Sequence, residues 1–167
     1  MREWTPVLIA IGSNIERERN IERALQALAA NYGELQQSSV YESAAVGFDS
    51  APFYNLVVAF QTGDPPQAVQ ETLRRIEDSQ GRLRAGELAA RTLDLDLLLY
   101  DDLVMHAGKL VLPRDDIDRY AFVLGPLAEI AGERCHPVSG VPYADLWSAF
   151  DKTGQELRRI DWPPAGR

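Results

Sequence analysis

The chain has 167 residues, of which 46% are hydrophobic and 25% are charged, as expected for one globular domain. Its net charge of −8 argues against broad nucleic-acid binding, and no apolar run reaches the roughly 18 residues of a membrane span. Cys135 is the only cysteine, which excludes an intramolecular disulfide. The first apolar run, residues 7–11, is too short for a signal-peptide core. We therefore expect a cytoplasmic monomer that binds neither nucleic acid nor a membrane.

The first third of the chain alternates between strand and helix patterns. Residues 7–11 predict a buried strand that ends at the turn of residues 12–14, which either presents N–H groups to an anion or caps the next helix. Apolar residues at spacings of three and four predict a helix over residues 20–31. Weak alternation predicts a strand over residues 36–41, and residues 42–52 then form a loop long enough to cover a site.

A polar amide stands inside the next apolar run, which predicts a strand over residues 53–61. Asn55 either bonds to a neighbouring backbone group or reads the edge of a heterocycle through its paired donor and acceptor. Asp64 and Pro65 then predict the start of a helix that continues to about residue 80. The loop after this helix is rich in arginine and either binds phosphate or caps the helix dipole. Its arginines are Arg82, Arg84 and Arg91.

Two aspartates lie two positions apart in the leucine-rich run of residues 91–100. Because successive side chains of a strand point to opposite faces, Asp94 and Asp96 share one face and have Cα atoms roughly 7 Å apart. Burying paired like charges without a cation is costly. The pair therefore either binds cations, such as two metal ions roughly 4 Å apart, or lines a solvated strand face.

The remainder of the chain gives weaker patterns. Short strands are predicted over residues 103–105 and 109–113. Residues 121–131 are apolar, and we expect their helix to begin near Pro126. A small helix over residues 142–150 precedes a loose tail.

The order strand, helix, strand, strand, helix, strand indicates an α+β domain on the ferredoxin-like βαββαβ plan. Such a domain has an antiparallel sheet with helices on one face, and its other face would be free to carry a site. We expect a single domain over residues 1–167, with a core at about residues 7–131 and C-terminal additions over residues 132–167.

Several stretches of the chain form one recognisable set of motifs. The most specific of them is Arg91-Thr92-Leu93-Asp94-Leu95-Asp96. The others include Gly12-Ser13-Asn14, Phe53-Tyr54-Asn55, Gln80-Gly81-Arg82-Leu83-Arg84 and Ala121-Phe122-Val123-Leu124-Gly125-Pro126-Leu127. Together, in this order, they make the chain resemble the 6-hydroxymethyl-7,8-dihydropterin pyrophosphokinase family over about residues 7–131.

The resemblance implies an ATP-dependent pyrophosphokinase of folate biosynthesis. Such an enzyme transfers pyrophosphate from ATP to the hydroxymethyl group of 6-hydroxymethyl-7,8-dihydropterin and releases AMP. Asp94 and Asp96 would hold two Mg²⁺ ions on ATP and, with Arg82 and Arg91, form the catalytic set. The pterin pocket would consist of Ser43, Ala44, Val46, Phe53, Asn55 and Phe122. The ATP contacts would be Glu77, Arg84, Lys109 and Arg114.

The sequence departs from the family in its cationic positions. Residues 87–91 replace the usual Arg-Trp-Gly-Pro-Arg, Arg114 stands where a histidine is usual, and Tyr120 stands where an arginine is usual. Removing one charge-assisted hydrogen bond to the phosphates would cost roughly 1.5–3 kcal/mol. The alternative is therefore a catalytically impaired or repurposed pterin- or nucleotide-binding paralogue on the same fold.

Overall fold

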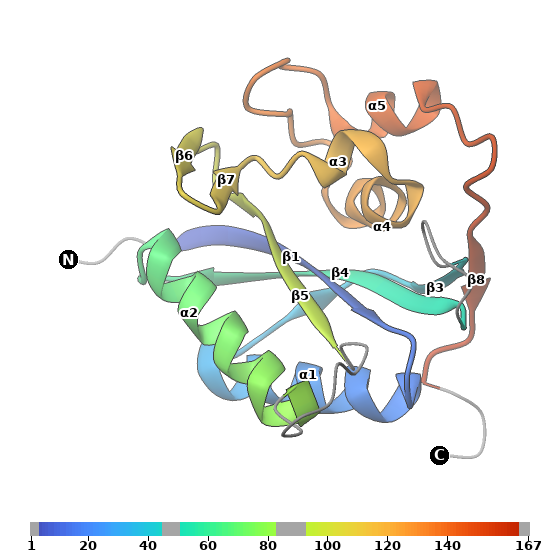
Figure 1. Cartoon of the computed structure of the whole chain (residues 1–167). Coiled ribbons are helices and arrows are strands. Elements are labelled where there is room, and N and C mark those ends of the chain that lie inside the picture. Colours follow the sequence, from blue (N-terminus) through green and yellow to red (C-terminus); the bar gives the residue numbers. More distant parts are fainter. Residues whose placement is uncertain (1–3, 45–50, 83–92, 164–167) are drawn as a thin grey trace.

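A six-stranded antiparallel sheet forms the centre of the protein, which a computed structural model describes over residues 4–44, 51–82 and 93–163, with the side chains of residues 81 and 82 excepted. Helices cover both faces of this sheet (Figure 1). The strand order is β5-β1-β4-β3-β8, and β2 also pairs with β4. The strands are β1 (Thr5–Ser13), β2 (Gln36–Gln37), β3 (Val40–Ser43), β4 (Phe53–Thr62), β5 (Asp94–Tyr100) and β8 (Arg158–Ile160).

Two helices pack on one face of the sheet, α1 (Arg17–Tyr32) and α2 (Pro66–Glu77), which is followed by one π-helical turn, η1 (Asp78–Arg82). Alternate residues of the central strands point toward them, so that Ile9 of β1 and Leu97 of β5 join Leu28 and Leu73 in one buried cluster. The prediction of a ferredoxin-like α+β domain is therefore confirmed, with the second strand segment split into β2 and β3.

The split in that segment has a local cause. Ser38 donates its backbone N–H to the Val57 carbonyl, and its Oγ accepts the Val57 N–H, both at 2.9 Å. At the junction of β2 and β3, the Ser38 hydroxyl thus replaces a backbone carbonyl as the acceptor for β4. The predicted strand of residues 36–41 becomes two short ones.

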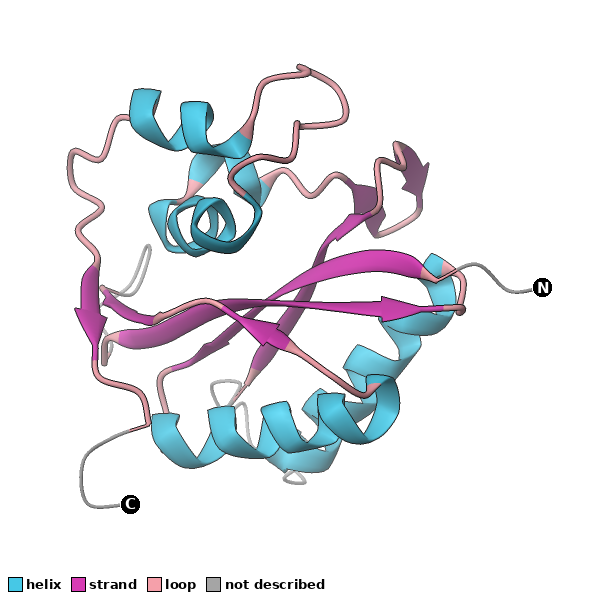
Figure 2. Ribbon diagram, turned by 180° about the vertical axis from the view of Figure 1, so that it is seen from behind, coloured by secondary structure: helices cyan, strands magenta, loops and turns pink. Residues whose placement is uncertain are grey.

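The opposite face carries the C-terminal helices, which appear above the sheet in Figure 2, so the expectation that this face is free of helices is wrong. They are α3 (Asp116–Arg119), α4 (Ala121–Ala131) and α5 (Tyr143–Ala149). Leu124 and Leu127 of α4 pack on Leu8 and Val57 of the sheet in a second buried cluster. A small hairpin of β6 (Met105–Ala107) and β7 (Leu110–Leu112) stands apart from the main sheet.

The predicted start of the last core helix near Pro126 is wrong, because α4 begins at Ala121 and runs through the proline. The Tyr120 carbonyl accepts the N–H groups of Val123 and Leu124, so the first turn forms before Pro126 is reached. The strand β8 was not predicted. None of the helices within the described ranges is long and apolar enough to cross a membrane.

Candidate active site

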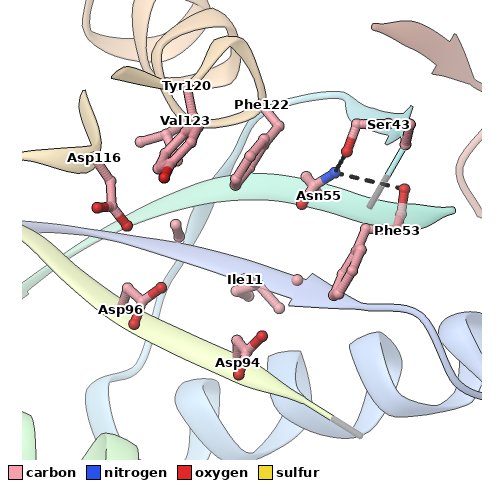
Figure 3. Close-up of a pocket in the computed structure, with 13 residues that line it drawn as sticks. Ile11, Ser43, Phe53, Asn55, Asp94, Asp96, Asp116, Tyr120, Phe122 and Val123 are labelled. Atoms are coloured by element: carbon pink, nitrogen blue, oxygen red, sulfur yellow. Dashed lines mark hydrogen bonds between the residues drawn. The ribbon is translucent and has the colours of Figure 1, made fainter. Parts of the chain in front are cut away.

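A cavity of about 310 Å³ lies between the sheet and the α3–α4 segment (Figure 3). Gly12 of β1 forms part of its floor, since it pairs with Asn55 of β4 on one side and with Asp94 of β5 on the other. The missing side chain at this position leaves the floor open between an amide and a carboxylate. The lining residues are Ala10, Ile11, Gly12, Ser43, Ala44, Phe53, Asn55, Asp94, Asp96, Asp116, Tyr120, Phe122 and Val123.

One end of the cavity is aromatic. Phe53 projects from β4, and Phe122 reaches down from α4 (Figure 3). The ring of Phe122 is stacked on Tyr120, with centroids 5.0 Å apart and an interplanar angle of 20°. Two aromatic walls on separate elements suit a flat heterocycle that offers a π-face to each.

Asn55 supplies the polar group of this aromatic end. Its side chain is buried among the strands, and its Nδ2 donates to Ser43 Oγ at 2.7 Å and to the Phe53 carbonyl at 3.5 Å. These contacts fix the plane of the amide, which is the condition for reading the edge of a ring by paired hydrogen bonds. The hydrogen bond from Asn55 to the Phe53 carbonyl agrees with the first interpretation from the sequence, a bond to a neighbouring backbone group. Asn55 also lines the cavity, and its recognition of a heterocycle edge stays a prediction.

The other end of the cavity carries carboxylates. Asp94 and Asp96 lie on its side of β5, whereas Leu95 and Leu97 are 3% and 2% exposed in the core. The predicted alternation is thus confirmed. A third carboxylate, Asp116 at the start of α3, also lines the cavity and was not singled out from the sequence. Its only signal was its place two residues after Arg114 in a charged run.

Arg114 joins two of these carboxylates. Its Nη2 lies 3.5 Å from Asp96 Oδ1, and its Nε donates to Asp116 Oδ2 at 3.1 Å. Its backbone N–H donates to the Leu98 carbonyl at 3.0 Å, which ties it to β5. Burial disfavours the charged guanidinium, but the Asp96 and Asp116 carboxylates outweigh it and raise the pKa of Arg114.

Glu77 lies behind the carboxylate strand rather than in the cavity. It is 3% exposed, and its Oε2 accepts the N–H of Leu95 at 2.7 Å. Burial and the nearby charge of Asp94 raise the pKa of Glu77, although the backbone hydrogen bond lowers it. Because β5 lies at the edge of the sheet, no strand pairs with its outer side. Glu77 accepts the Leu95 N–H in place of a neighbouring strand. Its contact with ATP stays a prediction.

The structure brings most of the predicted site residues together. Those that line the cavity are Ser43, Ala44, Phe53, Asn55, Asp94, Asp96 and Phe122. Lys109 is exposed in the β6–β7 turn and does not line it. The remaining predictions fall outside the described part of the chain, and they concern Val46, Arg84, Arg91 and the side chain of Arg82.

The donor set at the carboxylate end fits a hard cation that also binds a ligand. Mg²⁺ is usually held by one or two protein carboxylates together with phosphate oxygens of the substrate. Asp94 and Asp96 supply two carboxylates on one strand face. In the described residues no group of three or more His, Cys, Asp or Glu side chains forms a complete metal cage. A Mg²⁺ ion bound to these two carboxylates would take further ligands from phosphate oxygens of a substrate.

Fold and cavity together define an α+β enzyme of the ferredoxin-like type, with separate aromatic and carboxylate ends in one site. The profile of the family described as 7,8-dihydro-6-hydroxymethylpterin-pyrophosphokinase (HPPK) matches residues 8–132. The chain belongs to this family of pyrophosphokinases.

Known relatives agree with this assignment. The 2-amino-4-hydroxy-6-hydroxymethyldihydropteridine pyrophosphokinase of Haemophilus influenzae is 36% identical over 137 residues, which cover 80% of this chain and 86% of that protein. The protein of the same name from Bacillus subtilis is 37% identical over 126 residues, 73% of this chain and 75% of that one.

Solved structures show the same fold. Plasmodium falciparum HPPK-DHPS A437G with STZ-DHP superposes with a TM-score of 0.74 at 13% identity, over 88% of this chain. This chain spans 45% of that longer one, so the likeness concerns the fold alone.

Proposed function

We propose that this chain transfers pyrophosphate from ATP to the hydroxymethyl group of 6-hydroxymethyl-7,8-dihydropterin in folate biosynthesis, releasing AMP. The observation that carries the proposal is one cavity with Phe53, Phe122 and a fixed Asn55 at one end and Asp94 and Asp96 at the other. A monomeric state is part of the proposal. The single cysteine of the sequence suits a reducing, cytoplasmic compartment.

The aromatic end would bind the pterin. The flat ring would lie between Phe53 and Phe122, and the Asn55 amide would pair with its pyrimidine edge. The described lining residues of this end carry no charge, which suits a neutral heterocycle. Its hydroxymethyl group would then point along the Gly12 floor toward Asp94.

The carboxylate end would bind the phosphates of ATP. Asp94 and Asp96 would hold two Mg²⁺ ions, and bound Mg²⁺ would neutralise the charge that grows on the phosphate oxygens. Arg114 lies at this end between Asp96 and Asp116. The N–H groups of its guanidinium that do not contact these carboxylates can donate hydrogen bonds to a phosphate. Arg82, Arg84 and Arg91 are proposed as further phosphate contacts.

In the proposed reaction the hydroxymethyl oxygen forms a bond to the β-phosphorus of ATP. The bond between that phosphorus and the oxygen bridging to the α-phosphate breaks, and AMP leaves with the bridging oxygen. In the overall reaction the proton of the hydroxymethyl group is released to solvent. The work of the protein is to align the attacking and leaving oxygens and to exclude water. Stacking on Phe53 and Phe122 orients the pterin, which carries the attacking oxygen. The carboxylate end orients ATP.

The alternative from the sequence was an impaired or repurposed binder. The relatives compared above carry the name of the enzyme, and this chain keeps both aspartates of the motif. Arg114 retains a positive charge where the family usually has a histidine, and its guanidinium can hold phosphate by a forked pair of bonds. These observations favour turnover.

A direct assay tests the proposal. The purified protein with ATP, Mg²⁺ and 6-hydroxymethyl-7,8-dihydropterin should release AMP and pterin pyrophosphate in equal amounts. Asp96→Asn should lower turnover by roughly a hundredfold or more, because loss of a metal ligand removes several kcal/mol of charge stabilisation. The exposed Asp102→Asn serves as the matched control. Pterin binding without AMP release would refute the proposed reaction, and full activity of Asp96→Asn would refute the metal role.

A further inference from the structure

Arg17, the first residue of α1, contacts two strands from the face opposite the cavity. Its Nη1 lies 3.0 Å from Glu42 Oε2 on β3 and donates to the Pro52 carbonyl at 3.1 Å. Its guanidinium carbon lies 3.8 Å from the centre of the Tyr54 ring, in a cation–π contact. One side chain thus contacts three residues of two segments that begin 25 and 35 positions further along the chain.

Each contacted residue is a chain neighbour of a cavity residue. Glu42 precedes Ser43, Pro52 precedes Phe53, and Tyr54 stands between Phe53 and Asn55. Glu42 pairs with Tyr54 across the strands, and Ser43 pairs with Phe53. Because side chains alternate between faces, Glu42 and Tyr54 point toward α1, where Arg17 contacts both. Ser43 and Phe53 point toward the cavity (Figure 3).

The burial of these contacts makes Arg17 the main anchor. The Arg17 and Glu42 side chains are 28% and 22% exposed. Arg158 of β8 also donates to Glu42, at 2.9 Å on Oε1, but its own side chain is 71% exposed and its pair is open to solvent. Arg158, and to a smaller extent Arg17, lower the pKa of Glu42. The Glu42 carboxylate therefore stays ionised and can pair with both arginines.

We propose that Arg17 is a positioning residue for the pterin, which presets the spacing of the Ser43 and Phe53 walls before the substrate binds. The inference rests on the proposed function, since it assigns the pterin to this end of the cavity. When the walls of a site are ordered before the ligand binds, binding loses less conformational entropy and the affinity is higher. Removal of the Arg17 side chain should therefore weaken the pterin end and leave the carboxylate end intact.

Arg17→Ala tests the proposal, with the exposed Arg23→Ala on the same helix as the matched control. We expect the KM for the pterin to rise about tenfold, because the ionic and cation–π interactions of the guanidinium are removed. The KM for ATP and kcat should stay within about twofold of wild type, the range of ordinary surface substitutions. Arg17→Lys, which keeps the charge without the planar fork, should give an intermediate KM for the pterin. Glu42→Gln keeps the cation–π contact and should also be intermediate.

Amide hydrogen exchange of the ligand-free protein gives a second readout that does not depend on the reaction. Exchange should accelerate in residues 40–44 and 51–56 of Arg17→Ala and stay unchanged in β5. An unchanged KM for the pterin, an equal rise in both KM values, or unchanged exchange at 51–56 would each overturn the proposal. If the wild-type protein itself shows no turnover, the proposed function fails, and the exchange result alone decides whether Arg17 orders these walls.

Discussion

Replacing Gly12 with alanine should weaken pterin binding without weakening the fold. Gly12 is not among the described glycines with positive φ, so alanine can adopt its backbone conformation. A Cβ at this position would lie 3.3 Å from Asn55 Oδ1 and 3.8 Å from Phe53 Cδ2. The first distance is shorter than an ordinary van der Waals contact, so the Asn55 side chain must move away by a few tenths of an ångström.

The expected size of the effect follows from what Asn55 does. Its amide is held by Ser43 at 2.7 Å, and a shift of a few tenths of an ångström misaligns it against a bound heterocycle. A polar group left badly paired in a buried site costs about 1–3 kcal/mol, which is roughly a 5- to 150-fold loss of pterin affinity. Replacement of a strand glycine by alanine stabilises the fold by about 0.4–1 kcal/mol where the conformation is compatible, which offsets the local strain.

The assay combines the KM for the pterin with the Tm of thermal unfolding. Gly12→Ala should raise the KM for the pterin and leave the Tm near or above that of wild type. Gly140→Ala is the matched control, because Gly140 has φ +73° and no atom within 4 Å of an added Cβ. That variant should lose stability and keep its KM. A Gly12→Ala enzyme with wild-type KM would refute the role assigned to the floor.

Two further predictions concern charges around the site. Arg114→Ala should lower kcat/KM for ATP by roughly 10- to 100-fold, because it removes a charge-assisted contact from Asp96, whereas Arg134→Ala, which breaks an exposed pair, should have little effect. Burial, and then donation to Glu129, raise the pKa of Tyr41 from 10.0 to about 12. The stability from this bond should be complete below pH 10 and lost as the pH rises through about 12, and tyrosinate absorbance should show a late step that Tyr41→Phe removes. A Tyr41 that titrates near the ordinary value of 10.0 would contradict this, as would an unchanged kcat/KM in Arg114→Ala.

Sequence patterns predicted those features that depend on short-range periodicity. Alternation within β5 placed Asp94 and Asp96 on one face and the leucines on the other, because a strand repeats every two residues whatever it packs against. The element order predicted the sheet topology, since few connections of such elements are compatible with short loops. The aromatic and amide residues of the pterin end were recognised from the family motif and lie together in the cavity.

The features that sequence reasoning missed depend on contacts between distant segments. The strand β8 forms only because Val40–Glu42 offers it an edge, and its own three residues carry little strand signal. Asp116 enters the cavity through the turn that leads into α3, which no local pattern specifies. Arg17 meets Glu42 across 25 positions of the chain. Pro126 was expected to begin its helix, but the tertiary packing of α4 on the sheet outweighs the preference of proline for a first turn.

The charges of the cavity explain why its two ends should respond differently to mutation. The described carboxylate end holds Asp94, Asp96 and Asp116, and Arg114 is the cation that contacts two of them. Such an end repels the phosphates of ATP unless further cations accompany them. The described pterin end is neutral and needs no such compensation. Under the proposed function, changes at the pterin end should therefore act on the KM for the pterin, whereas changes at the carboxylates should act on ATP binding and turnover.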